Sequence, residues 1–247
     1  MNLMLFLSSL SLPNLVSRMP GGVAQGIIWG LMALGLYITF RILDVADLTV
    51  DGSFATGGAV TVMLILAGVP SWVAILVALA AGIIAGTVTG LLHTRLGIPA
   101  ILAGILTQFA LYSINLRIMG MAANKSANPD MYKLMLTMRN VPVAIIKGVI
   151  FAGIIIVVLY WYFGTEQGSA IRATGSNPAM SRAQGIDIDR MKVLGLAISN
   201  GMVSLSGGLM AQYQGFADIN MGRGAIVIGL AAVIIGEVIC DAIFRKG

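Results

Sequence analysis

Residues 71–92 read SWVAILVALAAGIIAGTVTGLL, an apolar run without a charged side chain. A helix needs about 20 mostly apolar residues to cross the hydrocarbon core of a bilayer, so this stretch predicts a membrane-spanning helix. Six other stretches share its length and character: residues 21–42, 49–69, 98–119, 141–163, 193–213 and 225–243. The sequence therefore predicts an all-α, polytopic integral membrane bundle of about seven transmembrane helices, in a single domain over residues 1–247.

The overall composition agrees with a bilayer environment. Hydrophobic residues make up 58% of the chain and charged residues 10%, against roughly 45–50% and about 25% in soluble domains. A soluble enzyme, a nucleic-acid-binding domain and a disordered chain are therefore excluded. The net charge of +5 does not indicate nucleic acid, because the basic residues are scattered between apolar runs. Cys240 is the only cysteine and His93 the only histidine, so we expect neither a disulfide framework nor a metal site.

The first 20 residues and the charge distribution bear on topology. Pro13 and Pro20 interrupt the apolar N-terminus and no basic segment precedes it, which favours an interfacial helix or ordered tail over a signal peptide. Four predicted spans separate residues 41–50 from the polar connection 164–192, so both lie on one side, together with residues 93–97. That side collects eight basic residues against seven on the other. The positive-inside rule favours a cytoplasmic position for residues 164–192, but a difference of one charge does not settle the topology.

Small residues recur every four positions on three predicted helices. Such spacing lets the backbones of neighbouring helices approach closely. The positions are Gly26 and Gly30; Ala78, Gly82, Gly86 and Gly90; and Asn200, Ser204 and Gly208.

The most polar connection contains the signals of a short capped helix. Residues 171–192 read IRATGSNPAMSRAQGIDIDRMK. Asn177 is a good N-cap, Pro178 suits the first helical position and Gly185 suits the position after the helix, which together predict a helix over residues 178–184. Asp187 or Asp189 can cap the spanning helix that follows. Because so short a helix is marginal alone, it either docks in a groove of a partner or belongs to an ordinary loop.

The same connection resembles a known family. The spaced pattern of Ala173, Gly175, Asn177, Ala183, Gly185 and Ile186 is similar to the cytoplasmic coupling loop of bacterial ABC importer permeases, in the group that includes branched-chain amino acid and ribose permeases. Residues 222–236, GRGAIVIGLAAVIIG, resemble the span that follows in that group. Residues 37–53, YITFRILDVADLTVDGS, look closer to permeases assigned to tryptophan, tyrosine or related amino acids. The resemblance covers about residues 22–242.

The resemblance implies a permease subunit that forms the pathway for an amino acid or a similarly small polar solute. It implies a second permease subunit (a homodimer), two ATP-binding subunits that hold ATP and Mg, an extracytoplasmic solute-binding protein, and a multi-pass location in the bacterial cytoplasmic membrane. The chain has no G-x-x-x-x-G-K-[ST] loop, so it is not itself the ATPase. Family members run on for further spans, so we expect a C-terminally truncated chain. The residues expected to couple to the ATPase are Ala173, Gly175, Asn177, Pro178, Met180, Arg182, Ala183 and Gly185.

Candidates for the solute pathway or its gate lie at two places. Thr49, Asp51 and Ser53 lie where the second span begins. Glycine at Gly52 and at Gly57 and Gly58 could break that helix and turn backbone groups toward a cavity. Structural capping is the alternative. Glu237 lies inside the last predicted span, where the wider family has glycine; an acid there is costly unless it faces the bundle interior or water.

The other polar residues have simpler interpretations. Asp44 and Asp47 are expected as interfacial charges and helix caps. Gln108, Asn115 and Asn200 are expected to form hydrogen bonds between helices.

Two other classes of function are weighed against the importer permease. An ion-coupled secondary transporter would need intramembrane ionisable groups, for which only Glu237 and Asp51 qualify, and it would not need the capped helix. An intramembrane enzyme would need a convergent catalytic cluster, and the sequence offers no credible nucleophile, general base or metal ligand set.

Overall fold

The computed structural model describes residues 12–128, 131–132, 134–244, and the described part is mostly helical. The helices are α2 (Leu12–Tyr37), the π-helical η1 (Ile38–Ile42), α3 (Val50–Leu66), α4 (Ser71–Thr94), α5 (Ala100–Ile118), the 3-10 turn η2 (Met138–Asn140), α6 (Val141–Phe163), α7 (Glu166–Ser176), α8 (Pro178–Ala183), α9 (Ile188–Gln214) and α10 (Ala225–Phe244). Two short strands, β1 (Asn124–Ser126) and β2 (Phe216–Asp218), pair antiparallel.

All seven apolar stretches of the sequence are helical, which confirms the predicted all-α bundle. Six helices in the described part are long and apolar enough to cross a membrane, and α3, with 17 residues, is shorter. Within the predicted N-terminal interfacial segment, residues 1–11 lie outside the described part and residues 12–20 belong to α2.

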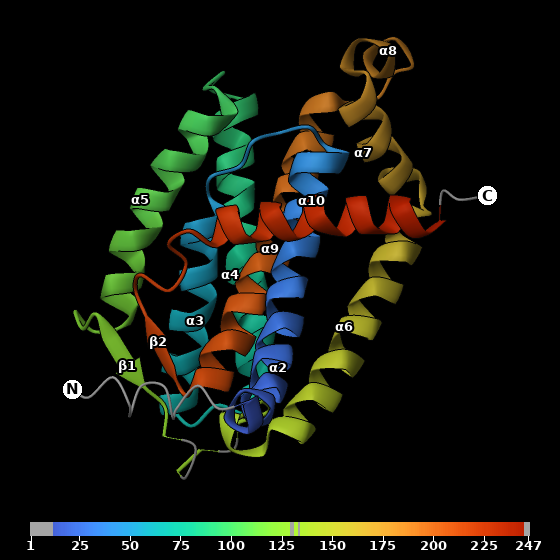
Figure 1. The fold of residues 1–247 in the computed structure, drawn as a ribbon. Helices are drawn as coiled ribbons and strands as arrows, with labels where there is room; N and C mark the ends of the chain where they lie inside the picture. Colours follow the sequence, from blue (N-terminus) through green and yellow to red (C-terminus); the bar gives the residue numbers. More distant parts are fainter. Residues whose placement is uncertain (1–11, 129–130, 133, 245–247) are drawn as a thin grey trace, which may run out of the picture.

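Helix α9 forms the centre of the bundle and contacts α2, α3 and α4 (Figure 1). The small residues predicted on α4 explain the closest of these contacts. A Cβ added at Gly82 or Gly86 would overlap the backbone carbonyls of Asn200 and Leu196 on α9. For Gly26 and Gly30 on α2, no described atom outside the backbone of that helix lies within 4 Å of an added Cβ, so the described part of the chain makes no such close contact at either position.

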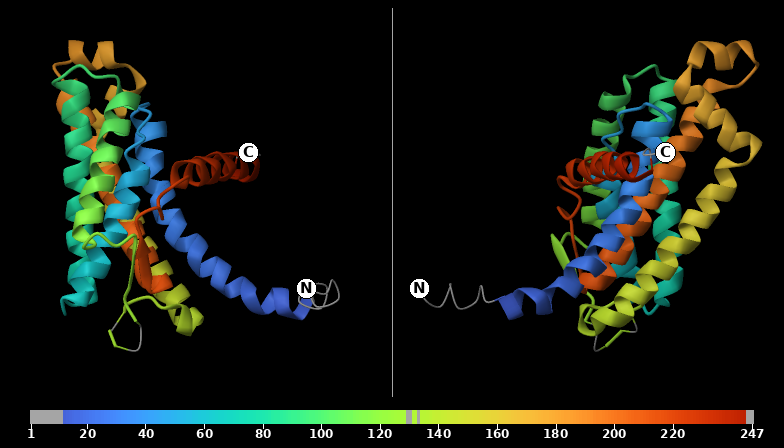
Figure 2. Two further views of the ribbon diagram at one scale, coloured as in Figure 1. Left: turned by 90° about the vertical axis from the view of Figure 1, so that its left-hand side faces the viewer. Right: turned by 45° about the vertical axis from the view of Figure 1, so that its right-hand side comes forward.

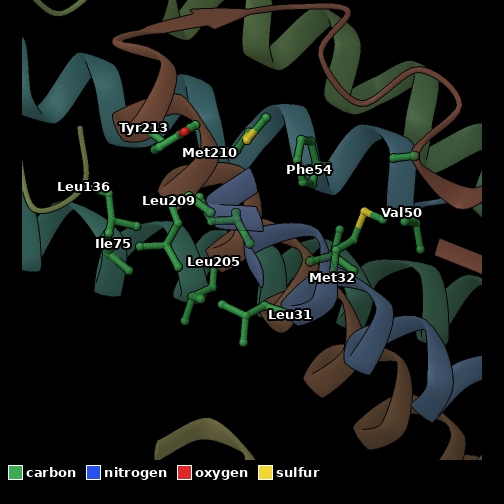
Figure 3. Packing of buried hydrophobic residues seen from close by; sticks show 14 of the residues in the cluster. Leu31, Met32, Val50, Phe54, Ile75, Leu136, Leu205, Leu209, Met210 and Tyr213 are labelled. Atoms are coloured by element: carbon green, nitrogen blue, oxygen red, sulfur yellow. The ribbon is translucent and has the colours of Figure 1, made fainter. Parts of the chain in front are cut away.

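The apolar core lies where α2, α3 and α9 meet (Figure 3). Met32, Phe54 and Leu209 are fully buried there, and the ring of Phe54 stacks on that of Trp29 with centroids 5.2 Å apart. The outward faces of α6 and α10 are apolar too, and Val157, Tyr160 and Val238 are exposed. Large exposed apolar faces fit a surface covered by lipid.

The connections predicted on one side of the membrane do lie at one end of the bundle. Lys192 Nζ stands 3.4 Å from His93 Nε2, and Gly175 lies against the backbone of Ile42. Helix α8 marks this end, and the strands β1 and β2 lie near the opposite end (Figure 1).

Helix α10 differs from the other long helices in direction. Its axis runs across the bundle and its C-terminal end projects away from it (Figures 1 and 2). After α9 ends at Gln214, the chain returns along α3 until Gly222 packs against the backbone of Asp51. Residues 225–243 form an apolar stretch of membrane-spanning length in the sequence. The contact between Gly222 and Asp51, which is tertiary, sets the direction of α10.

Candidate functional site

The 164–192 connection folds as two helices rather than one. Helix α7 was not predicted, because its sequence, EQGSAIRATGS, is polar and rich in glycine. One local signal for it exists: Thr165 is the N-cap, and its Oγ1 accepts a hydrogen bond from the Gly168 N–H at 3.4 Å. Most of its support is tertiary, because buried Ile171 packs with Leu43 and Leu196.

Helix α8 confirms the predicted short helix, at Pro178–Ala183. Asn177 Oδ1 accepts a hydrogen bond from the Met180 N–H at 3.0 Å, and Gly185 adopts φ +82° directly after the helix. This left-handed conformation favours glycine. Asp187 then caps α9, accepting from the Arg190 N–H at 3.2 Å.

The side chains of α8 divide into an inner and an outer set. Ser181 is buried and its Oγ donates to the Asn177 carbonyl at 3.0 Å, which fixes the helix to its own N-terminus. Met180, Arg182 and Ala183 are exposed. The end of the bundle therefore presents a capped helical tip with an exposed apolar side chain, a cation and a methyl group.

Thr49 and Ser53, predicted in the pathway or gate, lie inside a buried polar network. Ser53 Oγ donates to Asn200 Oδ1 at 2.6 Å, and Asn200 Nδ2 donates to Asp47 Oδ2 at 2.6 Å. The Thr49 N–H donates to Asp47 Oδ1 at 2.9 Å, and the hydroxyls of Thr49 and Thr89 are 2.8 Å apart. The network joins α3, α4 and α9 and confirms the interhelical role predicted for Asn200.

Asp47 is the residue of this network whose environment the sequence did not reveal. We expected an interfacial charge, but its side chain is 1% exposed. It lies in the connection before α3, and burial raises the pKa of its carboxyl above the ordinary value, while the hydrogen bonds from Thr49 and Asn200 act to lower it. Spacing alone gave one signal, since Asp47 stands two residues before Thr49, as in a local cap.

Asp51 ties α3 to the start of α10. Its two carboxylate oxygens accept hydrogen bonds from the Gly224 N–H at 3.2 Å and the Ile226 N–H at 3.1 Å. A carboxylate is favoured at this position by the positive end of the α10 dipole. The expected helix break at Gly52 does not occur, because α3 is continuous and Gly52 instead allows close contact with Gln108 and Leu111 of α5.

Glu237 lies on the outside of the bundle and not in its interior. Its Oε1 is 2.8 Å from Arg41 Nε at the end of η1, with the side chains 35% and 65% exposed respectively. The pair joins α10 to η1. Of the two environments expected for Glu237, the bundle interior or water, it does not have the interior, because the crosswise direction of α10 brings it to this edge.

A cavity of about 380 Å³ lies between α3, α5 and residues 219–223. Asp51, Gln108, Asn115 and Arg223 contribute its polar walls, and Phe109 and Tyr112 contribute aromatic ones. We expected Asn115 to form an interhelical hydrogen bond, but within the described residues its buried Oδ1 has no partner. Among the same residues, no three His, Cys, Asp or Glu side chains group as metal ligands.

Comparison with known proteins gives consistent matches along most of the chain. The family model described as branched-chain amino acid transport system / permease component matches residues 19–243. The tyrosine transport system permease protein of Clostridioides difficile is 40% identical over 214 residues, 87% of this chain and 71% of that protein. An uncharacterized protein of Rickettsia prowazekii is 38% identical over 215 residues, 86% of this chain and 74% of that protein.

More distant matches include a sugar permease. The ribose import permease protein of Escherichia coli K12 is 26% identical over 218 residues, 86% of this chain and 66% of that protein. No solved structure gives a significant match.

Proposed function

The chain belongs to the family of branched-chain amino acid transport permease components, and on that premise we propose that it is the membrane subunit of an ATP-driven importer of an amino acid or similar small polar solute. The name of the Clostridioides difficile relative favours an amino acid, because identity to that protein is 40%, against 26% to the ribose permease. The proposed location is the bacterial cytoplasmic membrane, with the α8 end in the cytoplasm.

The exposed tip of α8 is the observation that carries the proposed coupling to an ATPase. Asn177, Pro178 and Gly185 begin and end the helix, Gly175 lies against the backbone of Ile42, and the Ala173 carbonyl accepts from the Asn177 N–H at the end of α7. Met180, Arg182 and Ala183 are then presented to solvent without folding back on the chain. A short helix that is capped and exposed can insert into a cleft of an ATP-binding subunit, which would hold ATP and Mg.

The remaining partners follow from the same proposal. A second copy of the permease would complete the pathway, and a solute-binding protein would dock at the end opposite α8. The pathway helices can move only if polar contacts between them break and form again, and four of the predicted pathway residues make such contacts. Thr49 and Ser53 belong to the network between α3, α4 and α9, Asp51 holds the start of α10, and Glu237 holds α10 to Arg41. We place the gate among these contacts.

Reconstitution tests this function directly. The protein is incorporated into proteoliposomes with its ATP-binding subunit and solute-binding protein, and uptake of labelled L-amino acids is followed with and without ATP in the compartment that contains α8. Uptake that requires both partners and ATP is expected. Uptake driven by a proton or sodium gradient without ATP would instead indicate an ion-coupled secondary transporter.

A further inference from the structure

Helix α7 packs back onto the ends of two spanning helices. A Cβ added at Gly168 would overlap the backbone of Phe163, the last residue of α6, and one added at Gly175 would overlap the carbonyl of Ile42, the last residue of η1. Arg172 lies four positions after Gly168 and three before Gly175, and residues at these spacings share one face of a helix. Arg172 is therefore on the face of α7 that meets both α6 and η1.

An apolar groove of about 380 Å³ lies between α2, η1 and α6 beside this face of α7. Leu34 and Ile38 line it from α2 and η1, and Ile156 and Leu159 line it from α6. Its lining on α6 extends over seven positions, about 10 Å at 1.5 Å per residue. Among the described residues that line this groove, Arg172 is the one with a charged side chain.

A second cavity, of about 630 Å³, adjoins the groove, because Tyr160, Phe163 and Arg172 line both. It opens on the outer face of α6, where Tyr160 is 84% exposed and Trp161 is 71% exposed. Arg172 is again the charged residue among those described in its lining. One guanidinium thus serves both an apolar groove and an aromatic surface.

These residues lie at one border of the predicted membrane span. The apolar span that contains α6 ends at Phe163, so Tyr160 and Trp161 occupy its last turn. Aromatic side chains with a polar atom favour the membrane–water interface, and long basic side chains at helix ends reach the headgroup level. Arg172 is exposed, and its side chain makes no hydrogen bond or ion pair with another described residue.

The combination of an unpaired guanidinium with an apolar groove selects an amphiphile that carries an anionic group. A guanidinium matches a phosphate through two parallel hydrogen bonds. A free phosphate ion would leave the groove empty, whereas the acyl chain of a lipid can fill it. A lipid with a net negative headgroup also leaves a charge for Arg172 to neutralise, which a zwitterionic lipid does not.

We propose that this groove binds one anionic phospholipid of the leaflet at the α8 end. One acyl chain lies between α2 and α6, and the phosphate accepts hydrogen bonds from the Arg172 guanidinium. The inference goes beyond the proposed function, because it requires only that α6 spans a membrane.

Native mass spectrometry of the purified full chain in detergent tests the headgroup selection by counting bound lipid. The probes are phosphatidylglycerol and phosphatidylcholine with the same two acyl chains, which differ in net headgroup charge. Wild type is expected to retain phosphatidylglycerol about fivefold more strongly, a difference of about 1 kcal/mol. Arg172→Gln should remove this preference. Arg95→Gln, the same substitution at an exposed arginine that lines neither cavity, should preserve it.

A second pair of variants tests the groove. Ile156→Trp places a large ring in the groove and should lower the retention of both lipids alike. Ile154→Trp, the same substitution at an exposed position of α6 outside both cavities, should match wild type. Arg172, Ile156 and the two control positions are exposed, so none of the four substitutions disturbs the core.

Three results would overturn the assignment. The first is equal retention of the two lipids by wild type, or a phosphatidylglycerol preference that survives in Arg172→Gln. The second is undiminished retention of both lipids by Ile156→Trp, which would place the lipid elsewhere. The third is displacement of phosphatidylglycerol by inorganic phosphate alone, which would indicate a site for a soluble anion.

Discussion

Asn200, in the middle of α9, donates a 2.6 Å hydrogen bond to the carboxylate of Asp47, 153 positions earlier in the chain. Both side chains are buried, and Ser53 and Thr49 complete the bonding of the pair. A buried carboxylate that is surrounded by donors fixes the connection before α3 to the central helix. Asp47 is also the group of this network whose pKa the fold shifts, because burial raises it.

Asp47→Asn should remove a pH dependence of stability. Burial raises the pKa of Asp47 above its ordinary value of 3.8, so the folded state binds the proton more tightly than the unfolded state. The stability of the wild type, relative to the variant, therefore falls as pH rises from about 4 through the raised pKa. The fall is about 1.4 kcal/mol for each pH unit that separates the folded-state pKa from the unfolded-state pKa.

Thermal unfolding in detergent between pH 4 and pH 8 checks this difference. Asp189→Asn, at an exposed acid in the first turn of α9, provides the matched control. Parallel stability curves for wild type and Asp47→Asn would contradict the prediction.

Gly57→Ala should separate α3 from α9. A Cβ at Gly57 would overlap the backbone carbonyl of Ser204, and backbone cannot rotate away as a side chain can. Overpacking of this kind costs about 1–3 kcal/mol of unfolding free energy. Gly26→Ala is the matched control, because no described atom outside the backbone of α2 lies within 4 Å of its added Cβ. Equal melting temperatures for the two variants would show that α3 and α9 do not approach so closely.

Ala183→Trp should uncouple solute binding from ATP hydrolysis, whereas Arg182→Ala should have a much milder effect. Both side chains are exposed on α8, so neither substitution disturbs the core. A bulky ring would prevent insertion into a cleft, and an exposed ion pair of Arg182 would contribute under about 1 kcal/mol. The measurement is solute-stimulated ATPase activity of the reconstituted full-length complex. Wild-type stimulation in both variants would show that α8 is not the coupling helix.

A cysteine at Ser176 should report the orientation of α7 and α8. Ser176 is exposed at the end of α7, and Cys240, the single native cysteine, is exposed and must first be replaced by serine. In the Cys240→Ser, Ser176→Cys protein, an impermeant thiol reagent should label the chain only after the cells are permeabilised. Labelling in intact cells would place the α8 end outside the cytoplasm.

The long helices and α8 were predictable because their signals are local. Residues 71–92 can be identified as a membrane helix without knowing what they pack against, since crossing the bilayer requires about 20 apolar residues in any packing arrangement. Helix α8 was predictable for a similar reason. Asn177 and Gly185 satisfy backbone geometry within three or four residues of themselves.

Sequence by itself thus determined the membrane bundle, its central small-residue contacts and the capped helix at one end. Only the tertiary structure decided that α10 crosses the bundle, that Glu237 meets Arg41, that Asp47 is buried against Asn200 and that Asn115 Oδ1 is left unpaired among the described residues. Each of these depends on segments tens to almost two hundred positions apart. Hydropathy and capping report the environment of a few neighbouring residues, whereas the partner of a polar side chain is set by how whole helices pack against one another.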